Sequence, residues 1–192
     1  TAVFNGGSVT VTVTGSNFGS SSSGGWGGGG GHGPGGGGHS SSDNSVGAKG
    51  IKFDGNIEVS GGIITVTASK HEGIETKGTL TITGGEVYSQ SSDDAINAAS
   101  DLTISGGEVF VATTGNRYEY SSELTSSPKA VKADGNINIS NGSLTIAATG
   151  KCDGAEGLEC KKELTISGGD INVYAYDDAI SATEIFNIIN GT

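Results

Sequence analysis

The sequence is poor in the residues on which several common classes of protein depend. It has two prolines, no methionine and a single arginine, Arg117. Lysine and arginine together number 10 against 21 aspartates and glutamates, so the net charge is −11. Arginine is the side chain that best recognises phosphate groups, so a single arginine disfavours phosphate binding as the function. An acidic surface argues against nucleic acids and anionic membranes as partners, and it favours cations or neutral molecules.

Long apolar segments are also missing. No apolar run approaches the ~20 residues that span a membrane, and no signal peptide is visible at Thr1, so we expect a processed mature chain or a fragment. The only cysteines are Cys152 and Cys160. They are either two thiols, one of them buried, or a local disulfide around the intervening turn, and two cysteines do not fix the redox compartment.

What the sequence does have is glycine, at 36 of 192 residues, with much Thr, Ser, Ile and Val. This composition is typical of strands and tight turns rather than helices. Gly-Gly or Asn-Gly pairs recur along the chain, and those at 61, 84 and 106 are 23 and 22 residues apart. Each pair lies between short segments that alternate apolar and polar residues, as in LTITGGEVYS and LTISGGEVFV. Alternation predicts strands.

Each repeat contains three such segments, which can pair only with the same segments of the next repeat. The sequence therefore predicts an all-β, right-handed parallel β-helix of about seven coils, ~22 residues per coil, forming a single domain over 1–192. Aligned apolar positions predict three core columns: Ile57, Leu80, Leu102, Ile137, Leu164, Phe186; then Val59, Ile82, Ile104, Ile139, Ile166, Ile188; and Ile64, Val87, Val109, Leu144, Ile171.

Extra residues fall at one turn of the repeat, between the third strand of one coil and the first of the next. The predicted insertions are a Gly-rich loop at 15–46 and a second loop at 113–127, with a smaller one near 149–154. Insertions on one side of a solenoid usually mark its working face. The Gly-rich loop is either a flexible linker or an ordered flap, and it carries Trp26, the only tryptophan.

Charged residues beside the first strand repeat every three coils. One outward column reads Lys49, Glu72, Asp94, Lys129, Glu156, Asp178, and a second reads Lys52, Glu75, Asn97, Lys132, Glu159, Ser181. Lysine next to glutamate on the adjacent coil predicts exposed ion pairs: Lys49–Glu72, Lys52–Glu75, Lys129–Glu156 and Lys132–Glu159.

Where a coil with glutamates is followed by a coil with aspartates, these columns place like charges next to each other. Each resulting patch holds four carboxylates on neighbouring coils, which are destabilising at strand spacing unless a cation intervenes. All-oxygen ligands favour calcium over magnesium or zinc. A solvated acidic face balanced by the lysines is the alternative. The predicted ligands are Glu72, Glu75, Asp93, Asp94 and Asn97 in one patch, and Glu156, Glu159, Asp177 and Asp178 in the other.

Aromatic side chains gather near this oxygen-rich surface. Flat apolar rings with a polar rim are what a sugar-binding face uses, although strand propensity alone also explains aromatic residues here. The predicted carbohydrate-binding residues are Trp26, Tyr88, Phe110, Tyr118, Tyr120, Tyr174 and Tyr176.

The repeats EGIETKGTLTITGG, SDDAINAASDLTISGG and YDDAISATEIFNIING resemble the bacterial carbohydrate-binding β-helix domain of extracellular proteins from cellulose-degrading anaerobes. The resemblance covers 47–192 well and 1–14 in part. It implies a right-handed parallel β-helix with bound calcium, an extracellular or cell-surface location, and binding to cellulose-like or acidic plant polysaccharides.

The same helix is similar to that of pectate lyases, some of which hold calcium with Asp-Asp-x-x-Asp and an acid from the preceding coil. Asp93, Asp94 and Asn97 match that stretch with Asn97 in place of the third aspartate, and Ser181 departs further. Lys129 or Lys132 would have to act as the base. A non-catalytic polysaccharide binder is therefore the first hypothesis, and a head-to-tail stacked fibre and a calcium-dependent lyase are the alternatives.

Overall fold

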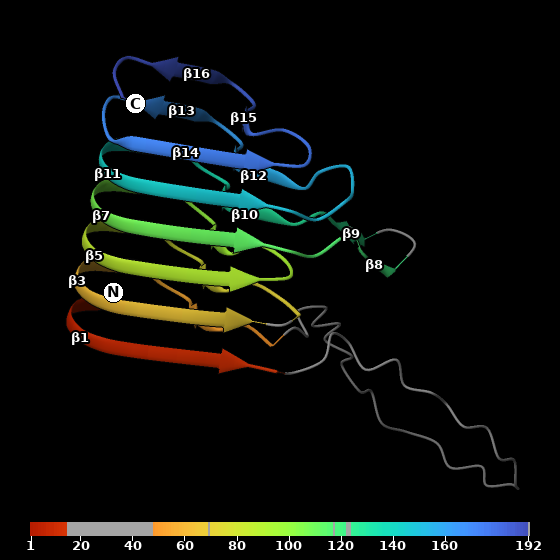
Figure 1. Cartoon of the computed structure of the whole chain (residues 1–192), viewed down its shortest axis with the longest axis horizontal. Helices are drawn as coiled ribbons and strands as arrows, with labels where there is room; N and C mark the ends of the chain where they lie inside the picture. Colours follow the sequence, from red (N-terminus) through yellow and green to blue (C-terminus); the bar gives the residue numbers. More distant parts are fainter. Residues whose placement is uncertain (15–47, 69, 117, 122–123, 192) are drawn as a thin grey trace, which may run out of the picture.

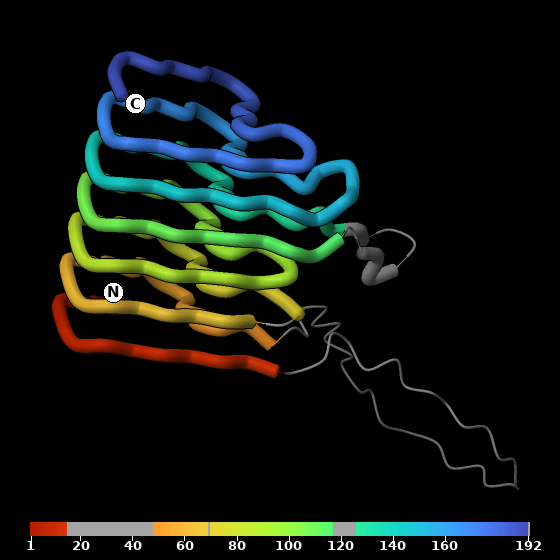
Figure 2. Tube along the Cα trace, in the orientation of Figure 1, coloured from red at the N-terminus to blue at the C-terminus, as the bar shows by residue number. Residues whose placement is uncertain are grey.

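The computed structural model describes residues 1–14, 48–68, 70–116, 118–121 and 124–191. It is a parallel β-solenoid, as the repeat predicts (Figure 1). Near strands run left to right while the coils rise from β1 to β16, so the chain winds right-handed (Figure 2). The predicted Gly-rich loop at 15–46, with Trp26, lies outside the described residues.

Two parallel sheets make up the walls of the solenoid. The larger sheet follows the order β1-β3-β5-β7-β11-β13-β16, with β14 also paired to β11, and the smaller follows β15-β12-β10-β6-β4-β2. The larger sheet comprises β1 (Ala2–Val13), β3 (Ile57–Ala68), β5 (Leu80–Ser91), β7 (Leu102–Thr113), β11 (Ile137–Ala148), β13 (Glu163–Ile166), β14 (Asp170–Ala175) and β16 (Ile185–Ile188). The smaller comprises β2 (Ile51–Phe53), β4 (Ile74–Thr76), β6 (Ile96–Ala98), β10 (Lys129–Ala133), β12 (Glu156–Cys160) and β15 (Ile180–Ala182).

The insertions occur where the sequence places them. They follow β1, β7 and β11, each at the end of a long strand and before the next strand of the smaller sheet. Within the second insertion, β8 (Tyr118–Ser121) pairs antiparallel with β9 (Leu124–Ser126). The described chain therefore leaves the larger sheet for all three insertions on the same side of the solenoid (Figure 1).

Glycine allows each long strand of the larger sheet to bend at its middle. Gly85 and Gly107 have φ near +82° and +85°, a conformation that side chains rarely adopt. A Cβ on Gly107 would lie 2.8 Å from the carbonyl oxygen of Gly85 on the coil below. The repeated glycine is thus required twice, by the backbone dihedral angle and by the close approach of the next coil.

The core runs up the axis between the two sheets. The predicted columns pair in register, with Ile57 beside Leu80 and Leu80 beside Leu102, and these side chains are at most 1 % exposed. Ile171 is half-buried, and the clear exceptions are Phe186 and Ile188, at 48 % and 65 % exposed. They sit on β16, the last strand of the sheet order, where no further coil among the described residues covers them.

The cysteines are thiols rather than a disulfide. Cys160 is fully buried in the core, in register with Ala133 below and Ala182 above. Cys152 is half-buried before β12. The described part of the chain contains no helix that is long and apolar enough to cross a membrane.

Candidate functional site

Strand pairing brings the predicted charge columns together as the sequence indicates. Glu75 is in register with Asn97, and Lys132 with both Asn97 and Glu159. The turn before β4 carries Glu72, and the turn before β6 carries Asp93 and Asp94 on the next coil. We call Glu72, Glu75, Asp93, Asp94 and Asn97 the first acidic centre, and Glu156, Glu159, Asp177 and Asp178 the second acidic centre.

The carboxylates of the first acidic centre are buried. Glu72, Glu75, Asp93 and Asp94 are only 7 %, 2 %, 2 % and 3 % exposed. The predicted ion pairs of this ladder were expected at the surface, which is wrong for the first centre. Lys49, with a side chain 8 % exposed, lies 3.3 Å from Glu72 Oε1 and also contacts Glu75.

The predicted partner of Glu75 was Lys52, and here the structure differs. Glu75 contacts Lys49 and Lys77, whereas Lys52 is exposed. An exposed ion pair with Lys52 would stabilise the fold little, because water screens it. Buried carboxylates need a partner, and Lys49 reaches two of them. In the same way, Glu159 lies 3.8 Å from Lys129 rather than forming the predicted pair with Lys132.

Asp94 is held by groups of its own coil and the next. Its Oδ1 accepts a hydrogen bond from the Lys129 backbone N–H at 2.8 Å, and its Oδ2 accepts one from Asn97 Nδ2 at 3.0 Å. Lys132 Nζ lies 3.9 Å from Asp94 Oδ2. Burial, together with the charge of Asp93, nevertheless raises the pKa of Asp94 well above its ordinary value.

A histidine that sequence reasoning missed completes the first acidic centre. His71 is 4 % exposed; its Nδ1 contacts Glu72 and lies 3.4 Å from Asp93 Oδ2. Burial alone would raise the pKa of Glu72, but the hydrogen bond and charge of His71, with Lys49, lower it to about 2. The available signal was position, because His71 directly precedes the repeated Glu-Gly pair while Ala155 takes that place in the second copy.

The second acidic centre is more open. Asp177 and Asp178 are exposed, and Glu156 and Glu159 are half-buried. Lys129 Nζ lies 3.1 Å from Glu156 Oε1 and donates to the Gly154 carbonyl at 2.7 Å. Asp177 Oδ2 accepts the Gly154 N–H at 2.6 Å. The Lys129 amine is therefore engaged by the second centre, which leaves only Lys132 near Asp94 for the base that a lyase would need.

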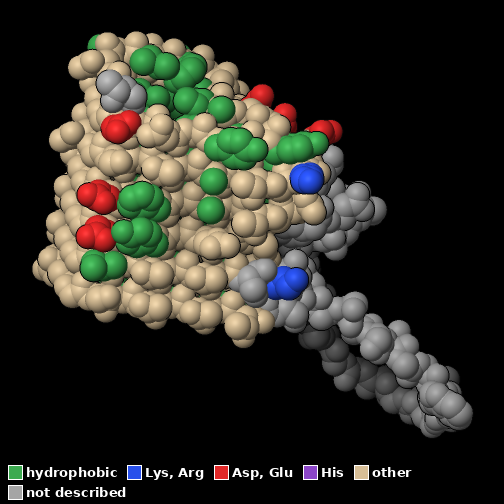
Figure 3. All heavy atoms as spheres, viewed as in Figure 1, with side chains coloured by type: hydrophobic (Ala, Val, Ile, Leu, Met, Phe, Trp, Pro, Cys, Tyr) green, Lys and Arg blue, Asp and Glu red, His purple; other side chains and the backbone are tan. Residues whose placement is uncertain are grey.

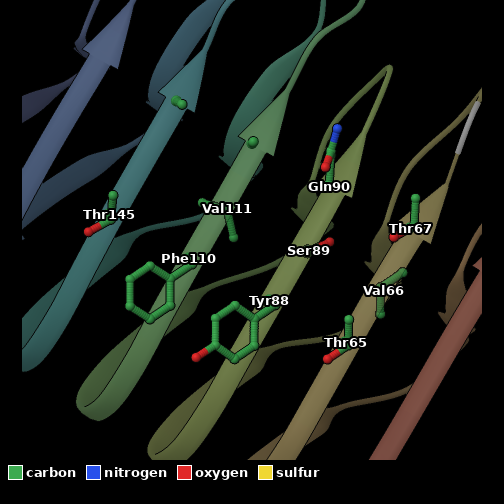
Figure 4. Close-up of a pocket in the computed structure, with 11 residues that line it drawn as sticks. Thr65, Val66, Thr67, Tyr88, Ser89, Gln90, Phe110, Val111 and Thr145 are labelled. Carbon is green, nitrogen blue, oxygen red and sulfur yellow. The ribbon is translucent and has the colours of Figure 1, made fainter.

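A separate surface lies on the outer face of the larger sheet. Tyr88 on β5 and Phe110 on β7 are in register, with ring centroids 5.0 Å apart and ring planes 4° from parallel. Figure 4 shows the two rings side by side on the outer face of the sheet. The Tyr88 hydroxyl donates to Glu86 Oε2 at 3.0 Å, which fixes its ring and raises the pKa of Tyr88.

A row of residues with two alanines at its middle lies next to the aromatic pair. Gln90, Ala112, Ala147 and Tyr174 follow one another in register across four strands. The first three of these residues, with the aromatic pair and neighbouring threonines, line a shallow hollow of about 340 Å³ that ends at Ala147 (Figure 4). Tyr174, one strand beyond, is 68 % exposed. We call the pair Tyr88 and Phe110, with the row Gln90, Ala112, Ala147 and Tyr174, the sheet platform.

Tyr176, another of the predicted sugar-binding residues, lies outside the sheet platform. Tyr176 is 58 % exposed in the turn after β14, beside Asp177. Tyr118 and Tyr120 lie on β8 in the second insertion, and their side chains, like Trp26, lie outside the described residues. The structure thus places three of the seven, Tyr88, Phe110 and Tyr174, on one face.

The charge of this face is one-sided. The six strand segments that carry its outer rows, residues 8–13, 63–68, 86–91, 108–113, 143–148 and 170–175, contain no lysine or arginine. Their outward charges are Glu86, Glu108 and Asp170, which are in register through Ser143. Figure 3 shows hydrophobic and acidic side chains on this face, with lysine only near its margin.

Comparison with known proteins agrees with a sugar-binding surface. Neither a curated protein nor a solved structure matches the chain. One protein family does match, in three overlapping stretches at residues 1–95, 69–153 and 121–192, as expected of a repeat. These stretches together span the whole sequence, and the chain therefore belongs to the family described as carbohydrate-binding domain-containing proteins.

Proposed function

We propose that this chain is a non-catalytic extracellular protein that binds plant cell-wall polysaccharide on the sheet platform. The observation that carries the proposal is the stacked pair Tyr88 and Phe110 beside a floor of two alanines. Flat aromatic rings pack on the apolar faces of sugars, and small side chains let a chain approach the sheet closely. Membership of a carbohydrate-binding family supports the same conclusion.

The geometry also favours a direction for the bound chain. Tyr88, Phe110, Ala112 and Ala147 lie across successive strands, and strands in a sheet are ~4.8 Å apart. The strand spacing is close to the length of one sugar residue. In a glycan that runs along the solenoid axis, each successive sugar would therefore lie over a new strand. Gln90 and the threonines supply hydrogen-bonding groups at the rim, and the exposed Tyr174 ring lies at the far end.

Charge favours a neutral, cellulose-like polysaccharide over a pectin-like one on this face. Uronate carboxylates would meet Glu86, Glu108 and Asp170 with no lysine or arginine in the same strand segments. The carboxylates of the glycan and those of the protein would repel each other. A neutral glycan has only hydroxyls and apolar faces, which the threonines, Gln90 and the aromatic rings can satisfy.

Affinity retention on insoluble cellulose and on immobilised polygalacturonate tests the proposal. We expect cellulose to retain the protein, and we expect Phe110→Ala and Tyr88→Ala each to weaken retention by about tenfold, since an aromatic anchor contributes on the order of 1–2 kcal/mol. Asn138→Ala, exposed on the same sheet outside the sheet platform, is the matched control. Equal retention of all four proteins, or retention on polygalacturonate alone, contradicts binding of a neutral glycan at this face.

Calcium is proposed for the second acidic centre. Its side-chain donors are all oxygens, and exposed Asp177 and Asp178 can rotate toward Glu156 and Glu159. Glu156 Oε2 is buried, with no hydrogen-bond partner among the described residues. Calorimetric titration of chelated protein with calcium tests this, with Asp178→Asn as the variant; absence of heat and of any rise in melting temperature contradicts it.

Calcium fits the first acidic centre less well, although the sequence predicts it there too. Glu75 is engaged by Lys49 and Lys77, and Asp94 by the Lys129 N–H and by Asn97. His71 adds a nitrogen donor against Glu72. The oxygens that a calcium ion needs are therefore partly committed to other groups.

Head-to-tail association into a fibre is the second candidate. Phe186, Ile188 and Ile189 are 48 %, 65 % and 73 % exposed on the last coil, an apolar end that a second copy could cover. Sedimentation velocity over a range of concentrations tests it, with Phe186→Ser as the variant. A single monomeric species at all concentrations rules it out.

A further inference from the structure

Three side chains of the first acidic centre bring their donor atoms to one point. A ring nitrogen of His71, an oxygen of Glu72 and an oxygen of Asp93 all lie within 4.8 Å of one another, and His71 Nδ1 is 3.4 Å from Asp93 Oδ2. His71 and Glu72 come from the turn before β4, and Asp93 comes from the turn before β6 on the adjacent coil. All three side chains are buried, so the group is built into the solenoid rather than spread over its surface.

The other polar groups of the centre contact atoms different from those that the trio brings together. Lys49 takes the other oxygen of Glu72, Oε1, at 3.3 Å, and so leaves Oε2 turned toward His71. Glu75 and Asp94 have their own partners, as described above. Ser126 Oγ lies 3.4 Å from Asp93 Oδ1, the oxygen other than the one that faces His71.

The donor set indicates the class of ion. Calcium and magnesium are bound by oxygens, whereas an imidazole nitrogen suits zinc and other transition metals. One histidine and two carboxylates supply three ligands, and the fourth position of a tetrahedral zinc ion can then be taken by water. Two carboxylates also balance the double charge of the ion inside a buried site.

We propose that His71, Glu72 and Asp93 form a binding site for a divalent transition metal, with zinc as the ion to test. The second acidic centre serves as an internal comparison, because Ala155 stands where His71 stands in the first. Among the described residues, no other group of histidine, cysteine and carboxylate side chains converges in this way. The two copies of the repeat thus differ in ion class, with nitrogen and oxygen donors in one and oxygens alone in the other.

Titration of chelated protein with Zn²⁺, followed by calorimetry and by melting temperature, tests the site. We expect one equivalent of Zn²⁺ to bind and raise the melting temperature. His71→Ala should weaken Zn²⁺ binding by roughly tenfold or more, and it should fold because Ala155 occupies the matching turn. Asp93→Asn is a second variant with the same expected loss. The double variant His32→Ala/His39→Ala, in the Gly-rich loop, is the control and should bind Zn²⁺ like the parent.

Three results would overturn the proposal: no binding of Zn²⁺ by the parent protein, undiminished binding by His71→Ala and Asp93→Asn, or loss of binding in the loop control. An ordinary hydrogen bond between His71 and Glu72 would give the first of these results. Calcium titration and cellulose retention are measured on the same samples. Failure of the zinc site leaves those readouts unchanged, so it is distinguishable from failure of the proposed polysaccharide binding.

Discussion

Tyr88 and Phe110 stand on adjacent strands with ring centroids 5.0 Å apart and ring planes 4° from parallel. Their backbones pair directly, so the parallel register of β5 and β7 sets the stack. In-register pairing is what a solenoid provides, and here it places the aromatic side chains of two adjacent coils side by side. The sheet platform is therefore a product of the repeat itself, without any insertion.

The stack should contribute measurably to folding. A double-mutant cycle of Tyr88→Ala and Phe110→Ala, followed by urea unfolding, should give a coupling free energy of about 0.5–1.5 kcal/mol beyond the sum of buried areas. The pair Tyr88 and Thr145, two strands apart on the same row, is the control and should couple by less than about 0.5 kcal/mol. Equal coupling in both cycles would mean that the stack adds nothing of its own.

Replacement of the bend glycine should destabilise the solenoid. Gly107→Ala puts a side chain at φ near +85° and a Cβ 2.8 Å from the Gly85 carbonyl oxygen, so we expect a loss of at least about 1–2 kcal/mol in the free energy of unfolding. Gly6→Ala is the matched control, because Gly6 has no atom within 4 Å of such a Cβ. Urea unfolding of both variants is the measurement, and similar losses would contradict a specific requirement at Gly107.

Removal of the buried Lys49 should destabilise the fold more than removal of the exposed Lys52, three residues later on the same coil. Lys49→Met leaves Glu72 and Glu75 buried without that amine, and breaking such a pair costs about 3 kcal/mol. Lys52→Met removes the same charge from an exposed position and should cost less than about 1 kcal/mol. Equal melting temperatures for the two variants would show that Lys49 does not neutralise the first acidic centre.

The sequence was enough for the fold because each coil repeats the same physical requirements. Leu80, Leu102 and Ile137 occupy one column since only an apolar side chain fits between the two sheets, and their register follows from counting residues after each glycine pair. The same counting placed Glu75 beside Asn97 and Lys132 beside Glu159. Phe186 and Ile188 failed as core residues because exposure depends on what lies above the last coil, which periodicity does not reveal.

The candidate site was less accessible to sequence reasoning. Column alignment gives the neighbours of a residue on the adjacent coils but not the reach of its side chain. Lys49 is aligned with Glu72, and its contact with Glu75, three residues further along the next coil, is therefore not predicted. His71 lies outside the repeating pattern, in a turn where the second copy has alanine. Alignment of the two copies could have drawn attention to His71, because the copies differ at this position and agree at the Glu-Gly pair that follows it.

Thiol labelling should distinguish the two cysteines and confirm that they are not bridged. Cys160 is fully buried between Ala133 and Ala182, and burial raises the pKa of its thiol, so it has little thiolate and no access to a reagent in the native state. Maleimide at neutral pH should therefore label only the half-buried Cys152, and both cysteines should react in urea without reductant. Cys152→Ser is the control and should leave the native protein unlabelled. Labelling of neither cysteine in urea would indicate a disulfide, and rapid native labelling of Cys160 would contradict its place in the core.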